Sequence, residues 1–190
     1  GERFAAMLAS EYDTQGSGYH WGTAAEMRGE FWALGFSASQ RNAGDISIPG
    51  KAWTESYDEL ENPRSFIPGV GIVELENPDG ELANSFHERS SWSLGGRVGS
   101  EEGFSVGTSF QKVEQNYGIP YYFAGDATDL FGDLSIDAGL ERGDLEMSNH
   151  FDPEAWFDDV KFRLGMGRYE HGEIFDGKSK DDGKRFKETA

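Results

Sequence analysis

The stretch that decides the fold runs from residue 104 to residue 111 and reads Phe-Ser-Val-Gly-Thr-Ser-Phe-Gln. Apolar or bulky residues alternate there with small or polar ones, as in a strand, whose successive side chains point to opposite faces. The turn sequence Gly99-Ser100-Glu101-Glu102-Gly103 precedes it. Before that turn, the same alternation runs from Trp92 to Val98. Turn residues between two alternating stretches predict an antiparallel hairpin.

Five further stretches with this alternation predict five more strands, and an eighth strand is predicted to start at Arg185-Phe186. The alternating positions of the five stretches are Phe4, Ala6 and Leu8; Tyr19, Trp21, Thr23, Ala25 and Met27; Trp32, Leu34, Phe36 and Ala38; Leu134, Ile136, Ala138 and Leu140; and Val160, Phe162, Leu164 and Met166. Prolines break the pattern between residues 43 and 82, where we predict a long loop. Two more loops are predicted at 118–129 and 175–184.

Composition excludes several classes of protein. The chain has 190 residues, 26 glycines, 14% aromatic residues and no cysteine, which fits one β-rich domain without a disulfide scaffold or thiolate metal site. A net charge of −18 makes a nucleic-acid partner improbable. The mean hydropathy of −0.64, without a long apolar run, excludes membrane helices. It leaves open a membrane barrel, whose strands are apolar on one face only.

Connection lengths and aromatic positions favour such a barrel. Tight turns at Gly29, Gly99 and Asp152 alternate with long loops, as in up-and-down outer-membrane barrels. Aromatic residues flank both kinds of connection and predict two interface belts. The belts comprise Phe31, Trp32, Phe104, Trp156 and Phe157 at the tight turns, and Tyr12, Tyr19, Tyr117, Tyr121, Tyr122 and Tyr169 at the other ends. The alternative is a soluble β-sandwich.

The barrel interpretation assigns each alternating position to lipid or to the interior. We predict that Trp21, Trp32, Leu34, Trp92, Phe104, Phe110, Leu134, Phe162 and Leu164 face lipid. We predict that Gly22, Gly35, Ser105, Gly107, Asp137 and Arg163 face inward.

Four stretches resemble the barrel of TonB-dependent outer-membrane receptors, particularly the branch associated with uptake of zinc and other metals. They are Asp45-Ile46-Ser47-Ile48-Pro49-Gly50, Asn116-Tyr117-Gly118-Ile119-Pro120, Ile136-Asp137 with Leu140-Glu141-Arg142-Gly143-Asp144-Leu145, and Tyr169-Glu170-His171-Gly172-Glu173-Ile174 with Phe186-Lys187. The family's barrel has about 22 strands and follows a plug domain. The resemblance therefore implies that residues 1–190 form an all-β, antiparallel, up-and-down transmembrane β-barrel segment. It is a partial barrel of about eight strands from the N-terminal part, without the plug or the remaining strands.

The resemblance implies a function as well as a fold. We expect a receptor in the bacterial outer membrane, in contact with its lipid, that takes up a scarce nutrient, a metal ion or metal chelate. An inner-membrane complex would supply energy through the plug domain. The alternatives are a small structural or adhesive barrel without a transport role, and a soluble carbohydrate-binding sandwich.

No set of residues predicts catalysis, so we expect no enzyme and no cofactor beyond a transported divalent metal. The best candidate site is Tyr169, His171 and Glu173, which strand alternation places on one face. An imidazole and a carboxylate two residues apart on a strand can share a metal ion, or can simply hydrogen-bond inside a polar lumen. Further substrate-path candidates have structural alternatives: interface anchoring for Tyr117, Tyr121 and Tyr122, and pairing with charges of a neighbouring strand for Arg142 and Asp144.

Overall fold

The computed structural model describes residues 3–52, 64–67, 71–74, 78–100, 102–120, 134–151, 159–175 and 184–189. Every regular element among them is a β-strand. These residues contain no helix that could cross a membrane.

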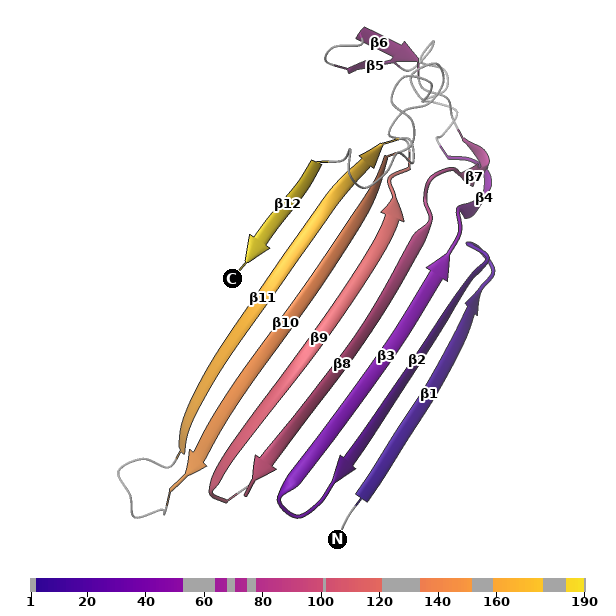
Figure 1. Ribbon diagram of the computed structural model, residues 1–190. Helices are drawn as coiled ribbons and strands as arrows, with labels where there is room; N and C mark the ends of the chain where they lie inside the picture. The colour runs from indigo at the N-terminus through magenta and orange to yellow at the C-terminus, as the bar shows by residue number, and fades with distance from the viewer. Residues whose placement is uncertain are drawn as a thin grey trace.

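An eight-stranded sheet forms the body of the molecule, and its strands lie side by side in sequence order (Figure 1). They are β1 (Arg3–Asp13), β2 (Gly18–Arg28), β3 (Trp32–Ala43), β8 (His87–Gly99), β9 (Phe104–Gly118), β10 (Leu134–His150), β11 (Asp159–Phe175) and β12 (Lys184–Thr189). All neighbours are antiparallel. The predicted all-β, antiparallel, up-and-down sheet is therefore confirmed. Within the described residues β1 and β12 do not pair with each other, so the sheet is open.

The segment predicted as one long loop contains four short strands. Here β4 (Ile46–Lys51) pairs with β7 (Asp79–Leu82), and β5 (Arg64–Ile67) pairs with β6 (Gly71–Glu74). The prolines that suggested a loop mostly flank these strands, as Pro63 and Pro68 flank β5. The exception is Pro49 in β4, where the pairing register with β7 shifts because proline has no N–H for the ladder.

The two ends of the main sheet carry different connections. The end near β4 and β7, here called the loop end, is where β1, β3, β9 and β11 end and β2, β8, β10 and β12 begin. The opposite end, here called the turn end, is where β2, β8 and β10 end and β3, β9 and β11 begin. The tight connection at 14–17 joins β1 to β2 at the loop end, before the stretch from Gly29 onward for which alternating tight turns and long loops were predicted. At the turn end, Gly99 has a φ of +127°, and a Cβ there would lie 2.2 Å from the Phe104 carbonyl oxygen. Only glycine fits that turn.

Strand register divides the large apolar side chains from the small and polar ones. Directly opposed residues project from the same face of an antiparallel sheet. One face, here called the banded face, carries an apolar band toward the turn end. Its members include Phe4, Leu8, Trp21, Met27, Trp32, Leu34, Phe36, Trp92, Leu94, Val98, Phe104, Val106, Phe110, Leu145, Met147, Val160, Phe162, Leu164 and Met166. Most of these side chains are exposed, for example Leu94 at 53% and Phe162 at 54%.

On the opposite face, here called the polar face, hydrogen bonds join short side chains of neighbouring strands. The hydroxyls of Ser37 and Ser93 lie 2.8 Å apart. The same distance joins the hydroxyls of Ser105 and Ser148, whose residues are 3% and 6% exposed. As predicted, Gly22, Gly35, Ser105, Gly107 and Arg163 all lie on this face.

Two predicted orientations in β10 are wrong. Leu134 lies on the polar face, and Asp137 lies on the banded face. The register explains both, because Leu145 is opposite Leu164 in the apolar band and Leu134 stands at an odd offset of 11 positions from Leu145, which places it on the other face. Leu134, Ile136 and Ala138 form the buried apolar core among the described residues, on the polar face near the loop end.

The predicted tyrosine belt is wrong at two positions. Tyr117 and Tyr169 project from the polar face, whereas Tyr12 and Tyr19 share the face of the apolar band. Four predicted belt residues lie outside the described residues: Tyr121, Tyr122, Trp156 and Phe157.

Candidate functional site

The loop end of the polar face brings together charged and aromatic side chains that are far apart in the sequence. Consecutive pairings align one row across β1, β2, β3, β8, β9, β10 and β11. The row consists of Glu11, His20, Arg41, Arg89, Gln115, Ala138 and His171. In the next row toward the loop end, His87 is opposite Tyr117, Tyr117 is opposite Ile136, and Ile136 is opposite Glu173. The row pattern places two functional clusters at opposite sides of the sheet.

The first cluster contains the predicted metal ligands. Tyr169, His171 and Glu173 share the polar face, as predicted, and the rings of Tyr169 and His171 have centroids 5.7 Å apart. The residues opposite them on β10 are Leu140, Ala138 and Ile136, which offer no ligand atom. Within the described parts of the chain, no group of three or more His, Asp or Glu side chains could hold a metal ion. His171 and Glu173 are thus aligned as predicted but have no third ligand from β10.

Arg142 and Asp144 pair with each other, and not with a neighbouring strand as expected. The Arg142 Nη2 atom lies 2.8 Å from Asp144 Oδ1, and Arg142 Nε donates to Asp144 Oδ2 at 2.9 Å. Glu146 of β10 makes cross-strand ion pairs instead, with its carboxylate 2.6 Å from Arg163 Nε and 3.6 Å from Lys161 Nζ, and His150 Nδ1 lies 3.7 Å from Asp159 Oδ1. Arg142 and Asp144 thus bond each other on the polar face.

Of the tyrosines predicted to meet substrate, Tyr117 stands beside His87 on the polar face, with ring centroids 6.2 Å apart. It therefore lies on β9, next to the second cluster, which occupies β1, β2, β3 and β8. Tyr121 and Tyr122 lie outside the described residues.

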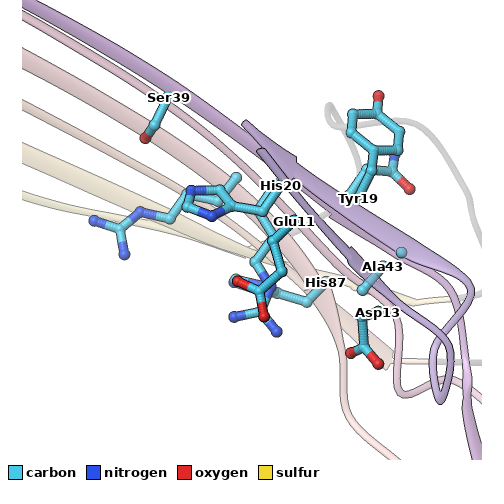
Figure 2. A pocket seen from close by; sticks show the side chains of 11 residues that line it. Glu11, Asp13, Tyr19, His20, Ser39, Ala43 and His87 are labelled. Carbon is cyan, nitrogen blue, oxygen red and sulfur yellow. The ribbon is translucent and has the colours of Figure 1, made fainter. Parts of the chain in front are cut away.

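The second cluster lines a cavity of about 460 Å³ on β1, β2, β3 and β8 (Figure 2). Its lining residues are Glu11, Asp13, Gly18, Tyr19, His20, Ser39, Arg41, Asn42, Ala43, His87 and Arg89. Figure 2 shows Glu11, His20 and Asp13 on one side of the sheet and the Tyr19 ring pointing away on the other. Acidic side chains thus border the cavity at β1, and basic ones border it at β3 and β8.

Positive charge accumulates on the β3–β8 side. Arg41 is directly opposite Arg89, and neither guanidinium has an ion pair or hydrogen bond with a described residue. His87 lies at the loop end, outside the apolar band. Burial lowers its pKa, and the charges of Arg41 and Arg89 lower it further. Sequence reasoning missed this cluster because Arg41 and Arg89 become neighbours only through the register of β3 with β8. The sequence offered one signal: alternation places each arginine on the same face of its strand as the small and polar residues.

Comparison with known proteins gives no assignment for these clusters. The chain matches no known protein family and no curated protein.

Proposed function

We propose that this chain supplies consecutive strands of a transmembrane β-barrel in a bacterial outer membrane. The observation that carries the proposal is the difference between the two faces of the sheet. A band of Trp, Phe, Leu and Met side chains, most of them exposed, crosses the main-sheet strands β1, β2, β3, β8, β9, β10 and β11 on one face. The other face carries Gly, Ser and paired charges. An outer-membrane barrel requires this division between lipid and lumen.

Strand length supports the same proposal. A strand crosses a bilayer with about 9–11 tilted residues. Strands β10 and β11 have 17 residues each. Along β8 the band runs from Trp92 to Val98, and toward the loop end the same face carries polar residues such as Glu88 and Ser90. In a barrel, these strands would extend beyond the bilayer at the loop end.

We further propose that the barrel is a TonB-dependent receptor that takes up a scarce nutrient, a metal ion or metal chelate. The clusters at the loop end of the polar face support a ligand route there. The resemblance of residues 45–187 to this receptor family supports energised transport. In this proposal Tyr169, His171 and Glu173 line the route and bind the metal together with ligands contributed by the cargo or by another part of the receptor.

Zinc uptake at limiting supply tests the receptor proposal in the full gene product. The double substitution His171→Ala/Glu173→Ala should slow uptake several-fold, because it removes an imidazole and a carboxylate that can bind zinc. The matched control is Ser109→Ala, on the same face at a distance from both clusters. Unchanged uptake by the double variant, at equal amounts of assembled barrel, would contradict the metal route.

A small structural barrel is the second candidate, and the number of strands favours it. The main sheet has eight strands, the number of the smallest outer-membrane barrels. The gene sequence on both sides of this chain separates the candidates. A plug domain upstream and further strand patterns downstream select the receptor, whereas pairing between β1 and β12 in the membrane-inserted protein selects the small barrel.

A further inference from the structure

The cluster on β3 and β8 contains two positive charges opposite each other, which costs stability unless a negative charge lies beside them. Like charges directly opposite each other on neighbouring strands destabilise a sheet. Arg41 and Arg89 are such a pair, and His20 is the next residue in their row. A residue pair of this kind calls for a compensating negative charge.

Among the residues that the structure describes, no carboxylate bonds either arginine. Elsewhere in the sheet, Arg142 and Arg168 each bond a carboxylate two residues farther along the same strand. The corresponding same-face neighbours are Ser39 and Ala43 for Arg41, and His87 and Ser91 for Arg89. None of these neighbours is acidic.

The carboxylates nearest in the row belong to the far border of the cavity. Glu11 and Asp13 lie on β1, with β2 between them and Arg41. Neighbouring strands are about 4.8 Å apart, so two strand spacings separate these carboxylates from the backbone of β3. Burial is the largest cause of the lowered pKa of His87, and the charges of Arg41 and Arg89 lower it further.

We propose that Arg41 and Arg89 together bind the anionic oxygen atoms of a soluble ligand, a phosphate or carboxylate group, in the cavity on the polar face. Guanidinium groups match both kinds of oxyanion because their N–H donors form a planar fork. The cavity of about 460 Å³ falls within the range of small-molecule sites, about 300–1,000 Å³. His20 and His87 border the bound anion, and Glu11 and Asp13 restrict it to the β3–β8 side. The identity of the cargo rests on the proposed uptake function. On that basis, the site specifies an anionic ligand, such as a chelate that presents free carboxylates.

Calorimetry on the full chain in detergent micelles tests the site, with inorganic phosphate and citrate as separate probes. We expect at least one probe to bind with a Kd of about 1 mM or tighter at low salt. The double variant Arg41→Gln/Arg89→Gln should lose roughly tenfold or more in affinity, because it removes both charge-assisted donors. The matched control Arg97→Gln removes an arginine from the polar face of β8 at the turn end and should change affinity less than about twofold. The probe that binds more tightly identifies the ligand group as phosphate or carboxylate.

A second variant separates loss of the site from loss of the fold. Arg41→Lys/Arg89→Lys keeps both charges but removes the bidentate geometry, so it should bind with intermediate affinity and show wild-type far-UV circular dichroism. Failure of the wild-type chain to bind either probe would overturn the proposal, as would equal losses in the Gln double variant and Arg97→Gln. Binding with the expected losses, combined with zinc uptake that is independent of the barrel, would reject the proposed uptake function and leave the anion site standing.

Discussion

The two faces of the same sheet are built in opposite ways. On the banded face, large side chains such as Phe36 and Leu94 stand exposed and make few contacts within the chain. On the polar face, short side chains bond in pairs across neighbouring strands, as Ser105 and Ser148 do. Both faces belong to the same hydrogen-bonded backbone, so they differ only in their side chains. One face exposes large apolar side chains, and the other joins many of its polar side chains to one another.

A charge placed on each face should give the largest difference. Phe36 and Gly35 are adjacent in β3 and point to opposite faces. In phospholipid vesicles, Phe36→Arg should lower the free energy of unfolding by about 2–4 kcal/mol, the cost of arginine facing the middle of a bilayer. Gly35→Arg is the control, because an added Cβ there meets nothing within 4 Å and Glu26 lies opposite it. Urea unfolding measures both, and equal losses would show that the banded face does not face lipid.

Removing one hydroxyl from the buried serine pair should have the next largest effect. Ser148→Ala leaves the Ser105 hydroxyl buried without its partner, which costs about 1–3 kcal/mol. The double variant Ser105→Ala/Ser148→Ala should lose less than twice as much, because it leaves no unsatisfied hydroxyl. Urea midpoints of the wild type, the single variants Ser105→Ala and Ser148→Ala, and the double variant form a complete double-mutant cycle. Strict additivity would mean that the polar face does not depend on this bond.

Breaking an exposed ion pair on the polar face should matter less than breaking the serine pair. Asp144→Asn removes the charge that bonds Arg142, but the Arg142 side chain is 57% exposed and water can replace its partner. We expect a shift in urea midpoint smaller than that of Ser148→Ala, and zinc uptake unchanged. A marked fall in uptake with normal stability would return Arg142 and Asp144 to the substrate path.

The smallest effect concerns the pH dependence of stability at His87. The pKa of His87 in the folded chain is lower than its ordinary value of 6.5. Between the pKa of the folded chain and 6.5, the unfolded chain therefore binds more protons than the folded chain. Stability should therefore rise with pH across that interval, and the gain should be complete above about pH 6.5. His87→Gln should flatten this part of the profile, as measured by urea midpoints from about pH 5 to pH 8. If an oxyanion binds Arg41 and Arg89, saturating phosphate should raise the His87 pKa in an NMR titration, and an unchanged pKa would count against that site.

Local alternation was sufficient to locate the strands of the main sheet, because a period of two can be read within each stretch. It was not sufficient at β10, where apolar residues change face within one strand. Leu134 and Ile136 belong to the polar face, and Leu145 and Met147 belong to the band. Both sets alternate, so only the pairing with β11 shows which set joins the band.

The candidate sites divide for the same physical reason. Tyr169, His171 and Glu173 were predictable as a group because they lie on one strand, two residues apart. Arg41 and Arg89 were not, because residues 44–86 separate them and the sequence does not specify the register that joins β3 to β8. Clusters that depend on register between distant strands require the structure.

The connection between β3 and β8 has a consequence for how this protein can change over evolution. The entropy lost in closing a flexible loop grows only with the logarithm of its length, so doubling this connection would cost about 0.6 kcal/mol. Its two ends are already held together by the long ladder from Trp32–Val98 to Ala43–His87. Insertions between β4 and β7 should therefore cost the main sheet little, whereas Asn84, which donates to the carbonyl oxygens of Ile119 and Leu134, ties the end of the connection to that sheet. New surface structure can be gained or discarded there while the strands below keep their register, which makes this connection the natural place for sequence diversification and for grafting foreign segments.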